Sequence, residues 1–219
     1  MLATHHGFAF VHIPRTGGTS VERALAPYSD SPVGTTAHAC TVLPHKHATA
    51  AELRGIVGPG RWDGLFTFST VRDPFDRMVS DYHFFRRCGP DLYPGFSERE
   101  RHLTDTALAL GIDGWLRQNA DALSMSQLDY LSDDGERLLV RWVCRLERLA
   151  FDFAGVCKSL GLKASLGHHN ATPHPSPALA LSPASVELIA SYCARDLEAF
   201  GYGLPHLPAR REEVTHGRV

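Results

Sequence analysis

The stretch that decides the fold is Phe8-Ala-Phe-Val-His-Ile-Pro-Arg-Thr-Gly-Gly-Thr-Ser20. Its near-continuous apolar first half is typical of a strand buried on both faces, as in a parallel sheet. Gly17 and Gly18 then let the backbone turn sharply and approach a ligand closely, and a helix-compatible pattern begins near Thr19. A strand, a glycine turn and a helix N-terminus together form an anion cradle. The stretch therefore predicts phosphate or sulfate binding, with an ordinary strand–loop–helix connection as the alternative.

The turn is not a Walker A loop, which needs a glycine, four residues and then Gly-Lys-Ser/Thr. Instead, Pro14-Arg-Thr-Gly-Gly-Thr-Ser20 resembles the 5′-phosphosulfate loop of the sulfotransferases that use PAPS (3′-phosphoadenosine 5′-phosphosulfate). The resemblance is to their carbohydrate-type branch, which carries Pro-Lys-Thr-Gly-Gly-Thr-Ser after a strand. Arg15 stands where the family usually has Lys. Arginine retains the positive charge but is a poor proton donor, so the difference concerns the mechanism more than the nucleotide.

Length and composition set the outer limits. The 219 residues suffice for one well-buried domain, and we expect a single sulfotransferase-like domain over 1–205 and a charged, mobile tail over 206–219. A formal charge of −2 argues against a general polyanion binder, so no nucleic acid partner is expected. The sequence has neither a long apolar run nor a signal peptide, which predicts a soluble, cytoplasmic protein without an integral membrane segment. Five widely spaced cysteines without a C-x-x-C pair indicate reduced thiols.

Strand-like and helix-like segments alternate along the chain. After the first strand and helix, further strands are expected at 65–71 and 138–144, and helices at 49–57, 74–85, 104–117, 123–131, 149–160 and 182–200. This order predicts an α/β fold: a three-layer, P-loop-like domain with a central parallel β-sheet flanked by helices and a site at the carboxyl ends of the strands. The helix after Pro74 has an apolar stripe and is expected to pack on the sheet, while Ser80 falls off that stripe.

Arg72 and Ser80 form the second motif, eight residues apart across a strand–helix junction. In the sulfotransferase family an arginine and a serine at these places bind the 3′-phosphate, and the resemblance implies the same role here. A guanidinium grips phosphate with two prongs, and a hydroxyl adds one donor. The alternative is a surface pairing of Arg72 with Asp73 or Asp76.

His47 is the candidate general base. An acceptor hydroxyl must lose its proton as it attacks sulfur, and neutral imidazole suits that task near pH 7. Lys46-His-Ala-Thr49 also matches a segment often seen in the carbohydrate-type branch. The alternatives are a solvent-facing or helix-capping His47, with His12 as the second candidate base. His45 and His47 lack a third partner with usable spacing, so no metal site is predicted.

Two further segments complete the resemblance. Trp142-Val-Cys-Arg-Leu-Glu-Arg-Leu149 resembles a family strand that ends in Gly-Arg-Phe-Glu-Asn-Leu, and Glu147 within it either orients Arg145 or a loop, or forms a surface pair. His168-His-Asn-Ala-Thr172 resembles a His-x-Asn-x-Ser segment that closes over the cofactor in this branch, which makes Asn170 a candidate contact.

The resemblance implies a PAPS-dependent sulfotransferase that moves a sulfuryl group in line to an acceptor hydroxyl of a glycan or small molecule, without a metal. Two rivals remain: a P-loop kinase or NTPase, and a nucleotide-binding protein without catalysis. The predicted 5′-phosphosulfate contacts are Arg15, Thr16, Gly17, Gly18, Thr19 and Ser20; the predicted 3′-phosphate contacts are Arg72 and Ser80; Asn170 is a further cofactor contact; His47 and Arg15 are the predicted catalytic residues.

Overall fold

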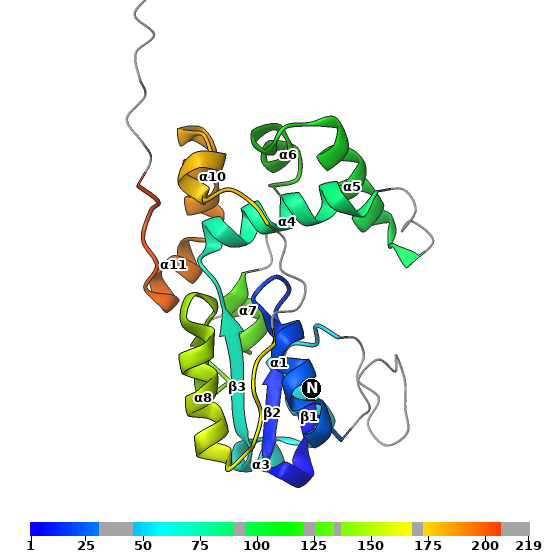
Figure 1. Ribbon diagram of the computed structural model, residues 1–219, viewed down its shortest axis with the longest axis vertical. Helices are drawn as coiled ribbons and strands as arrows, with labels where there is room; N and C mark the ends of the chain where they lie inside the picture. The colour runs from blue at the N-terminus through cyan, green and yellow to red at the C-terminus, as the bar shows by residue number, and fades with distance from the viewer. Residues whose placement is uncertain (31–45, 90–94, 121–125, 134–136, 168–172, 207–219) are drawn as a thin grey trace, which may run out of the picture.

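The computed structural model describes residues 1–30, 46–89, 95–120, 126–133, 137–167 and 173–206. Within these ranges one sheet of four strands has the order β1-β2-β3-β4 (Figure 1). The strands are β1 (Leu2–Ala3), β2 (Phe8–Val11), β3 (Phe66–Val71) and β4 (Trp142–Arg145). Strands β2, β3 and β4 are parallel, whereas β1 pairs antiparallel with β2. The sheet is therefore mixed, and the prediction of a parallel sheet was wrong at this edge.

The edge strand arises from the chain's first residues. After β1 the short 3₁₀ helix η1 (Thr4–His6) ends at Gly7, whose left-handed φ of 73° reverses the chain direction. In the parallel part, Val11 lies beside Ser69 in the register. The chain segments that leave β2 and β3 therefore emerge at the same end of the sheet.

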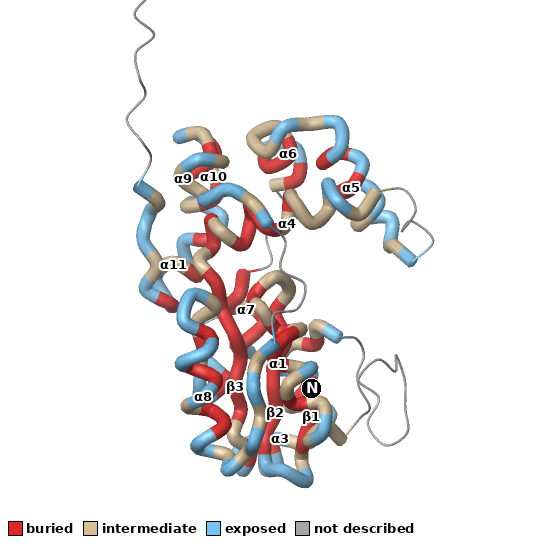
Figure 2. Tube along the Cα trace, in the orientation of Figure 1, coloured by how far each residue is buried: buried red, intermediate tan, exposed pale blue. Residues whose placement is uncertain are grey.

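Helices cover both faces of the sheet. The helices α1 (Gly18–Leu25) and α8 (Leu149–Leu160) pack on the face that carries Phe8, Phe10 and Phe68. The helices α2 (Ala50–Val57), α3 (Pro59–Gly64) and α7 (Gln127–Leu131) pack on the opposite face, against alternate strand residues. This arrangement buries β2 and β3, as Figure 2 shows in red.

Helix α4 (Pro74–Cys88) leaves the sheet at its carboxyl end and was predicted to pack on it. That prediction was wrong: Phe75, Met78 and Tyr82 belong to a separate core formed with other helices. These helices are α5 (Glu98–Ala109), α6 (Ile112–Gln118), α9 (Pro177–Ala180) and α10 (Pro183–Tyr192). An apolar stripe fixes which face of a helix is buried but not which partner buries it. The polar face of α4, with Ser80, is left to meet the loops at the strand ends.

Helix ends followed the sequence signals closely. Thr49 and Glu52 form the predicted capping box, Asp73 caps α4, and Gly161 ends α8 with a φ of 65°. The lengths and divisions of the helices were predicted less well than their ends. The segment expected as one helix over 104–117 is α5 and α6, the final helix divides into α10 and α11 (Ala194–Phe200), and α3 was not predicted. No helix within the described ranges has the length and apolar character needed to cross a membrane.

A buried carboxylate ties α11 to α7 and to the end of β3. Asp196 is fully buried and accepts hydrogen bonds from the backbone N–H groups of Gln127 (2.8 Å) and Leu128 (2.9 Å), and from the Ser126 hydroxyl. The Gln127 amide in turn bonds both backbone groups of Arg72, at 2.9 Å each. The backbone of Arg72 is therefore held by a helix 55 residues later in the chain.

We expect Asp196→Asn to lower the free energy of unfolding by about 2–4 kcal/mol, because buried hydrogen bonds to a charged acceptor contribute about 1.5–3 kcal/mol each. The matched control is Asp129→Asn, which removes only the exposed pair with Arg195 and should cost about 1 kcal/mol or less. Urea unfolding measures both, and equal losses would contradict the role assigned to Asp196.

Candidate functional site

The glycine turn ends at a helix N-terminus without a side-chain cap. Helix α1 starts at Gly18, one residue before the predicted start, and its N-cap is Gly17 in the left-handed region with a φ of 85°. Within the described residues, no side-chain hydrogen bond from the N-cap position caps this eight-residue helix. The first N–H groups of a helix lack intrahelical partners and favour anions. The turn therefore ends at the kind of helix N-terminus that anions favour, and its binding of phosphate or sulfate stays a prediction.

Close packing explains why two glycines stand here. A Cβ atom on Gly18 would lie 2.2–2.8 Å from atoms of the His12 ring, and one on Gly17 would lie 2.7 Å from the Leu146 side chain. His12 is itself almost fully buried, and its Nδ1 lies 3.0 Å from a carboxylate oxygen of Glu22. Burial lowers the pKa of His12. The start of α1 is thus held directly against a neutral, buried imidazole.

The hydroxyl groups of the turn do not all face one way. Thr16 is fully buried; its hydroxyl bonds the Ile13 carbonyl at 2.9 Å and the Thr70 hydroxyl at 2.8 Å, so its side chain is turned inward. Thr19 lies at the surface of the turn, and its hydroxyl accepts a hydrogen bond from the Lys46 ammonium group at 3.3 Å. Lys46 therefore places a cation beside the glycine turn, and this role was not predicted for it.

The Arg15 side chain points toward α4. Its Nη2 donates to the Ser80 hydroxyl at 2.9 Å, its Nε lies 3.7 Å from the Asp81 carboxylate, and its guanidinium lies 4.6 Å from the centre of the Phe84 ring. Arg15 also has a left-handed φ of 66°, which costs a residue with a Cβ about 1–3 kcal/mol. Ser80 and Arg15 are thus direct partners, although the sequence analysis assigned them to opposite ends of the nucleotide.

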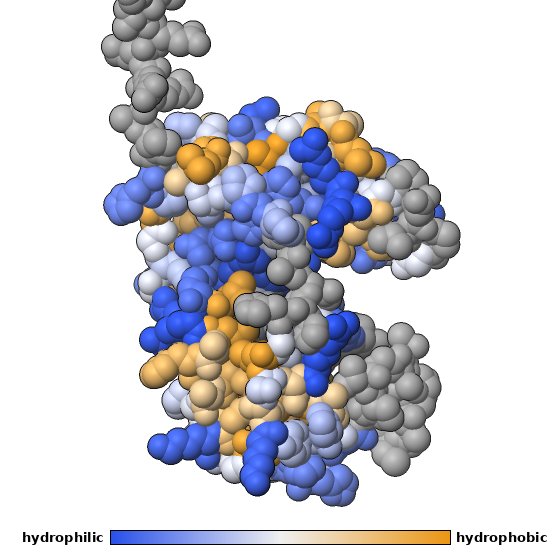
Figure 3. Space-filling model, viewed as in Figure 1, coloured by the Kyte–Doolittle hydropathy of each residue, from blue (hydrophilic) through white to orange (hydrophobic). Residues whose placement is uncertain are grey.

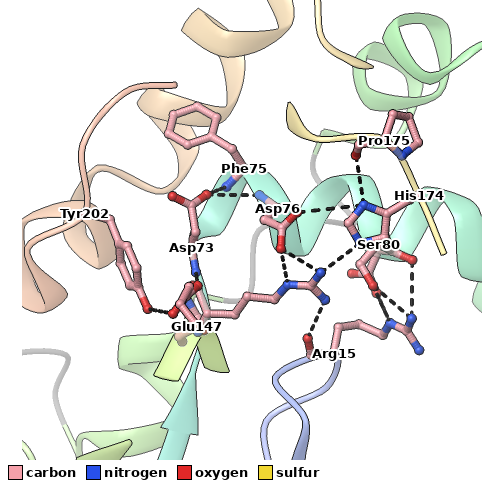
Figure 4. A network of polar contacts seen from close by, with 12 residues as sticks. Arg15, Asp73, Phe75, Asp76, Ser80, Glu147, His174, Pro175 and Tyr202 are labelled. Atoms are coloured by element: carbon pink, nitrogen blue, oxygen red, sulfur yellow. Dashed lines mark hydrogen bonds and ion pairs between the residues drawn. The ribbon is translucent and has the colours of Figure 1, made fainter. Parts of the chain in front are cut away.

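Arg72 lies beside Arg15, and its guanidinium has three partners (Figure 4). Its Nε donates to Asp76 at 2.8 Å, its Nη1 donates to the Arg15 carbonyl at 3.0 Å, and its Nη2 donates to Nε2 of His174 at 2.8 Å. The pairing with Asp76, raised as the alternative for Arg72, is therefore present. The contact with the Arg15 carbonyl also joins the two predicted anion-binding segments.

No role was predicted for His174, because it lies between two prolines in a segment without a helix or strand pattern. Its Nδ1 donates to the Pro175 carbonyl at 2.9 Å, which leaves Nε2 as the acceptor that faces Arg72. The ring also stacks on His83 of α4, with ring centres 6.1 Å apart. Asn170, predicted from the same loop, lies outside the described residues.

Glu147 joins its own segment to the start of α4 and to the segment that contains Tyr202. Its carboxylate accepts from the backbone N–H of Asp73 at 2.7 Å and from the Tyr202 hydroxyl at 3.0 Å (Figure 4). Two roles were predicted for Glu147: orienting Arg145 or a loop, and forming a surface pair. The structure shows that it binds the loop at the start of α4.

A pocket of about 640 Å³ opens at the carboxyl ends of β2 and β3. The glycine turn, Arg72 and Ser80 all line it. Its remaining wall is largely apolar and includes Leu149, Phe151 and Leu166 from α8 and the segment that follows. On the face seen in Figure 3, apolar surface gathers over these same elements, below the polar surface around α4.

His47 lies beside the pocket, against His12, and is half-buried. Its Nδ1 donates to the His12 carbonyl at 2.9 Å, and the two rings meet edge to face with centres 4.6 Å apart. Burial, with the neighbouring His12 in support, lowers the pKa of His47 to about 4. His47 is therefore neutral at pH 7, with the lone pair on Nε2.

No cluster of three or more His, Cys, Asp or Glu side chains suited to a metal ion occurs in the described ranges. The arrangement instead combines the start of α1, two neighbouring arginines, a pocket that they line and a neutral imidazole beside it. It can hold a ligand with two anionic groups and accept a proton next to it.

The family comparison agrees with this geometry. Residues 1–110 match the model of the sulfotransferase family, and this span contains the glycine turn, His47, Arg72 and Ser80. No curated protein and no solved structure matches the chain. Since the match covers half of the sequence, and covers it where the anion-binding turn, Arg72 and the buried imidazoles meet, this chain belongs to the sulfotransferase family.

Proposed function

We propose that this protein transfers a sulfuryl group from PAPS to an acceptor hydroxyl, with a carbohydrate as the acceptor and His47 as the general base. The observation that carries the proposal is the single pocket of about 640 Å³ that the glycine turn and the Arg72–Ser80 pair line together. The PAPS donor and the P-loop-like fold rest on the family. The carbohydrate acceptor rests on the resemblance of Pro14–Ser20 and Lys46–Thr49 to the carbohydrate-type branch.

The residues present suit the two ends of such a donor. The uncapped start of α1 and Gly17 would hold the 5′-phosphosulfate, and Arg72 would hold the 3′-phosphate. The Arg72 guanidinium now binds Asp76 and His174. A phosphate dianion that replaced these two partners would form two charge-assisted hydrogen bonds with the Arg72 guanidinium.

The apolar wall of the pocket suits the flat base of a nucleotide. Phe151 is 77% exposed although it is a large apolar residue, and it lines the pocket together with Leu149 and Leu166. An exposed aromatic ring beside a polar cradle provides a surface on which a base can stack.

When bound, PAPS supplies an activated sulfuryl group. The chain supplies the proton acceptor and the positive charge. Nε2 of His47 would take the proton of the acceptor hydroxyl, because Nδ1 is committed to the His12 carbonyl. The N–H groups at the start of α1 would stabilise the negative charge that develops on the leaving phosphate oxygen, and Lys46 adds a cation beside them. No metal has a part in this proposal.

One observation favours a second candidate, a protein that binds the nucleotide without turnover. Arg15 replaces the family's Lys, and its guanidinium is engaged with Ser80 and Phe84 on α4. Transfer of labelled sulfate from PAPS to a panel of carbohydrate acceptors separates the two. Tight binding of 3′,5′-ADP without any transfer would favour the second candidate, and a requirement for ATP and Mg²⁺ would contradict both.

Arg72→Gln should remove the preference for a 3′-phosphate. We expect the affinity for 3′,5′-ADP to fall about 10- to 100-fold, because a hydrogen bond to a charged group contributes about 1.5–3 kcal/mol. The affinity for 5′-AMP should fall less, because it loses only the support that Arg72 gives the turn through the Arg15 carbonyl. The matched control is Arg86→Gln, on the outer part of α4, which should leave both affinities unchanged. Isothermal titration calorimetry measures them, and equal losses for both nucleotides would contradict the assignment.

His47→Asn should lower kcat by about 10²- to 10⁴-fold, the usual contribution of a positioned base, with 3′,5′-ADP binding retained. His102→Asn, on α5, is the matched control and should leave kcat unchanged.

The ionisation of His47 gives a second readout that does not depend on an acceptor. Its lowered pKa means that the ring stays neutral as the pH falls past the usual histidine value of about 6.5 and gains a proton only near pH 4. The ring is therefore unprotonated at every pH above about 4, and the same lowered pKa makes it a weaker proton acceptor than a free imidazole. NMR titration of the imidazole between pH 8 and pH 5 should show no protonation of His47. A midpoint near 6.5 would contradict the buried, neutral state.

A further inference from the structure

We propose that the protein has a second anion site, at the end of the sheet opposite the nucleotide pocket, which binds small tetrahedral dianions such as sulfate or hydrogen phosphate. The site is a pocket of about 230 Å³ lined by Arg54, Arg137 and Arg141, with Trp62 and Thr67 beside them. The inference does not depend on the proposed function.

The position of this pocket separates it from the nucleotide site. Thr67 is the second residue of β3, and its carbonyl and hydroxyl accept from the backbone N–H of Arg141 at 2.9 and 3.1 Å. Arg72 follows the other end of the same strand. At about 3.3 Å per residue, the two strand ends lie roughly 17 Å apart. A ligand small enough for one pocket cannot reach the other.

Arg54 places an unpaired hydrogen-bond donor at this pocket. It comes from the last turn of α2, and its Nε is shielded from solvent and has no hydrogen-bond partner in the part of the chain that the structure describes. Buried polar groups are nearly always paired in folded proteins, and an unpaired donor is costly. An oxyanion in the pocket would supply the acceptor that this N–H lacks.

The charges around the pocket favour a dianion. Its described lining residues bear three guanidinium groups and one carboxylate, that of Asp63, and Arg137 makes a further contact of its own. The Arg141 guanidinium donates to the backbone carbonyl of Asp63, so this contact neutralises no charge. Guanidinium groups bind sulfate and phosphate oxygens in pairs.

The size of the pocket limits how much of a ligand it can enclose. Pockets for drug-sized molecules occupy about 300–1,000 Å³, which is more than this pocket offers. Trp62 lines the pocket, and its indole N–H already donates to the Leu139 carbonyl at 2.9 Å, so this donor is not free for a ligand. The pocket thus suits a single phosphoryl or sulfuryl group, whether free or at the end of a small molecule.

Nitrogen-15 NMR of the full chain tests this site residue by residue. Sulfate, phosphate and glucose 6-phosphate are titrated at constant ionic strength, with acetate as the monoanion control. We expect saturable shifts of the Trp62 indole N–H and of the Thr67 and Arg141 amides, with dissociation constants on the order of millimolar. Acetate should bind at least several-fold more weakly. Weaker binding of glucose 6-phosphate than of phosphate would identify a free ion as the occupant, and equal binding would identify a phosphoryl group on a larger molecule.

Arg54→Gln should weaken the binding of both dianions about tenfold, the loss expected for one hydrogen bond to a charged group. Arg195→Gln is the matched control: Arg195 is on α11 and pairs with Asp129, and its loss should change the affinity less than twofold. The proposal is overturned if Trp62 shows no saturable shift in the folded protein, or if the two variants lose affinity equally. It is also overturned if anions shift only the Gly17 and Gly18 amides, a result that would leave the sulfotransferase proposal standing.

Discussion

The site depends on one hydrogen bond, from the Arg72 guanidinium to the carbonyl of Arg15. It joins the end of β3 to the turn after β2, and so fixes the spacing between the two anion-binding segments. The turn needs such support because Arg15 adopts a left-handed backbone conformation that residues with a Cβ rarely occupy. Arg77 assists from α4 by donating to the Pro14 carbonyl at 3.2 Å. The backbone of Arg72 is in turn held by Gln127, so the support extends through α7 to the buried carboxylate of Asp196.

Internal anions keep the cationic side chains in position. Asp76 pairs with Arg72, and Asp81 lies near Arg15 within a largely buried environment. Buried arginines without such partners would repel one another and pay a desolvation cost. Burial still outweighs the attraction between Arg15 and Asp81, because it lowers the pKa of Arg15 and raises the pKa of Asp81. The arginines are therefore ordered without a nucleotide, and a ligand that binds them exchanges partners and does not have to order free side chains.

Local signals in the sequence predicted local structure well. The glycine turn, the capping box at Thr49 and the Asp73 cap each depend on residues a few positions apart, and each stands in the structure as expected. Arg72 and the turn were also expected at one end of the sheet, since parallel strands deliver their carboxyl ends together. The roles of the individual site residues remain proposals.

What the sequence did not reveal depends on contacts between distant segments. The apolar stripe of α4 does not say that other helices, and not the sheet, bury it. Ser80 was expected to bind a ligand, yet its partner in the structure is Arg15, 65 residues earlier in the chain. Gln127 and His174 meet Arg72 across 55 and 102 residues of sequence, and neither lies in a motif. Pair contacts of this kind have no periodicity, because tertiary packing alone creates them.

The position of α4 gives the protein a mechanical property. The helix continues directly from β3, yet its apolar side belongs to the core of the upper helices (Figure 1). A tilt of that helical unit about Pro74 would swing Ser80 and Phe84 while Arg72, bonded through its backbone to Gln127, stays in place. A repacking of the side chains around Trp115, which does not line the pocket, would thereby change the hydrogen bond between Arg15 and Ser80. Such a movement of the helices that pack around Trp115 would reach the glycine turn through the contact between Ser80 and Arg15.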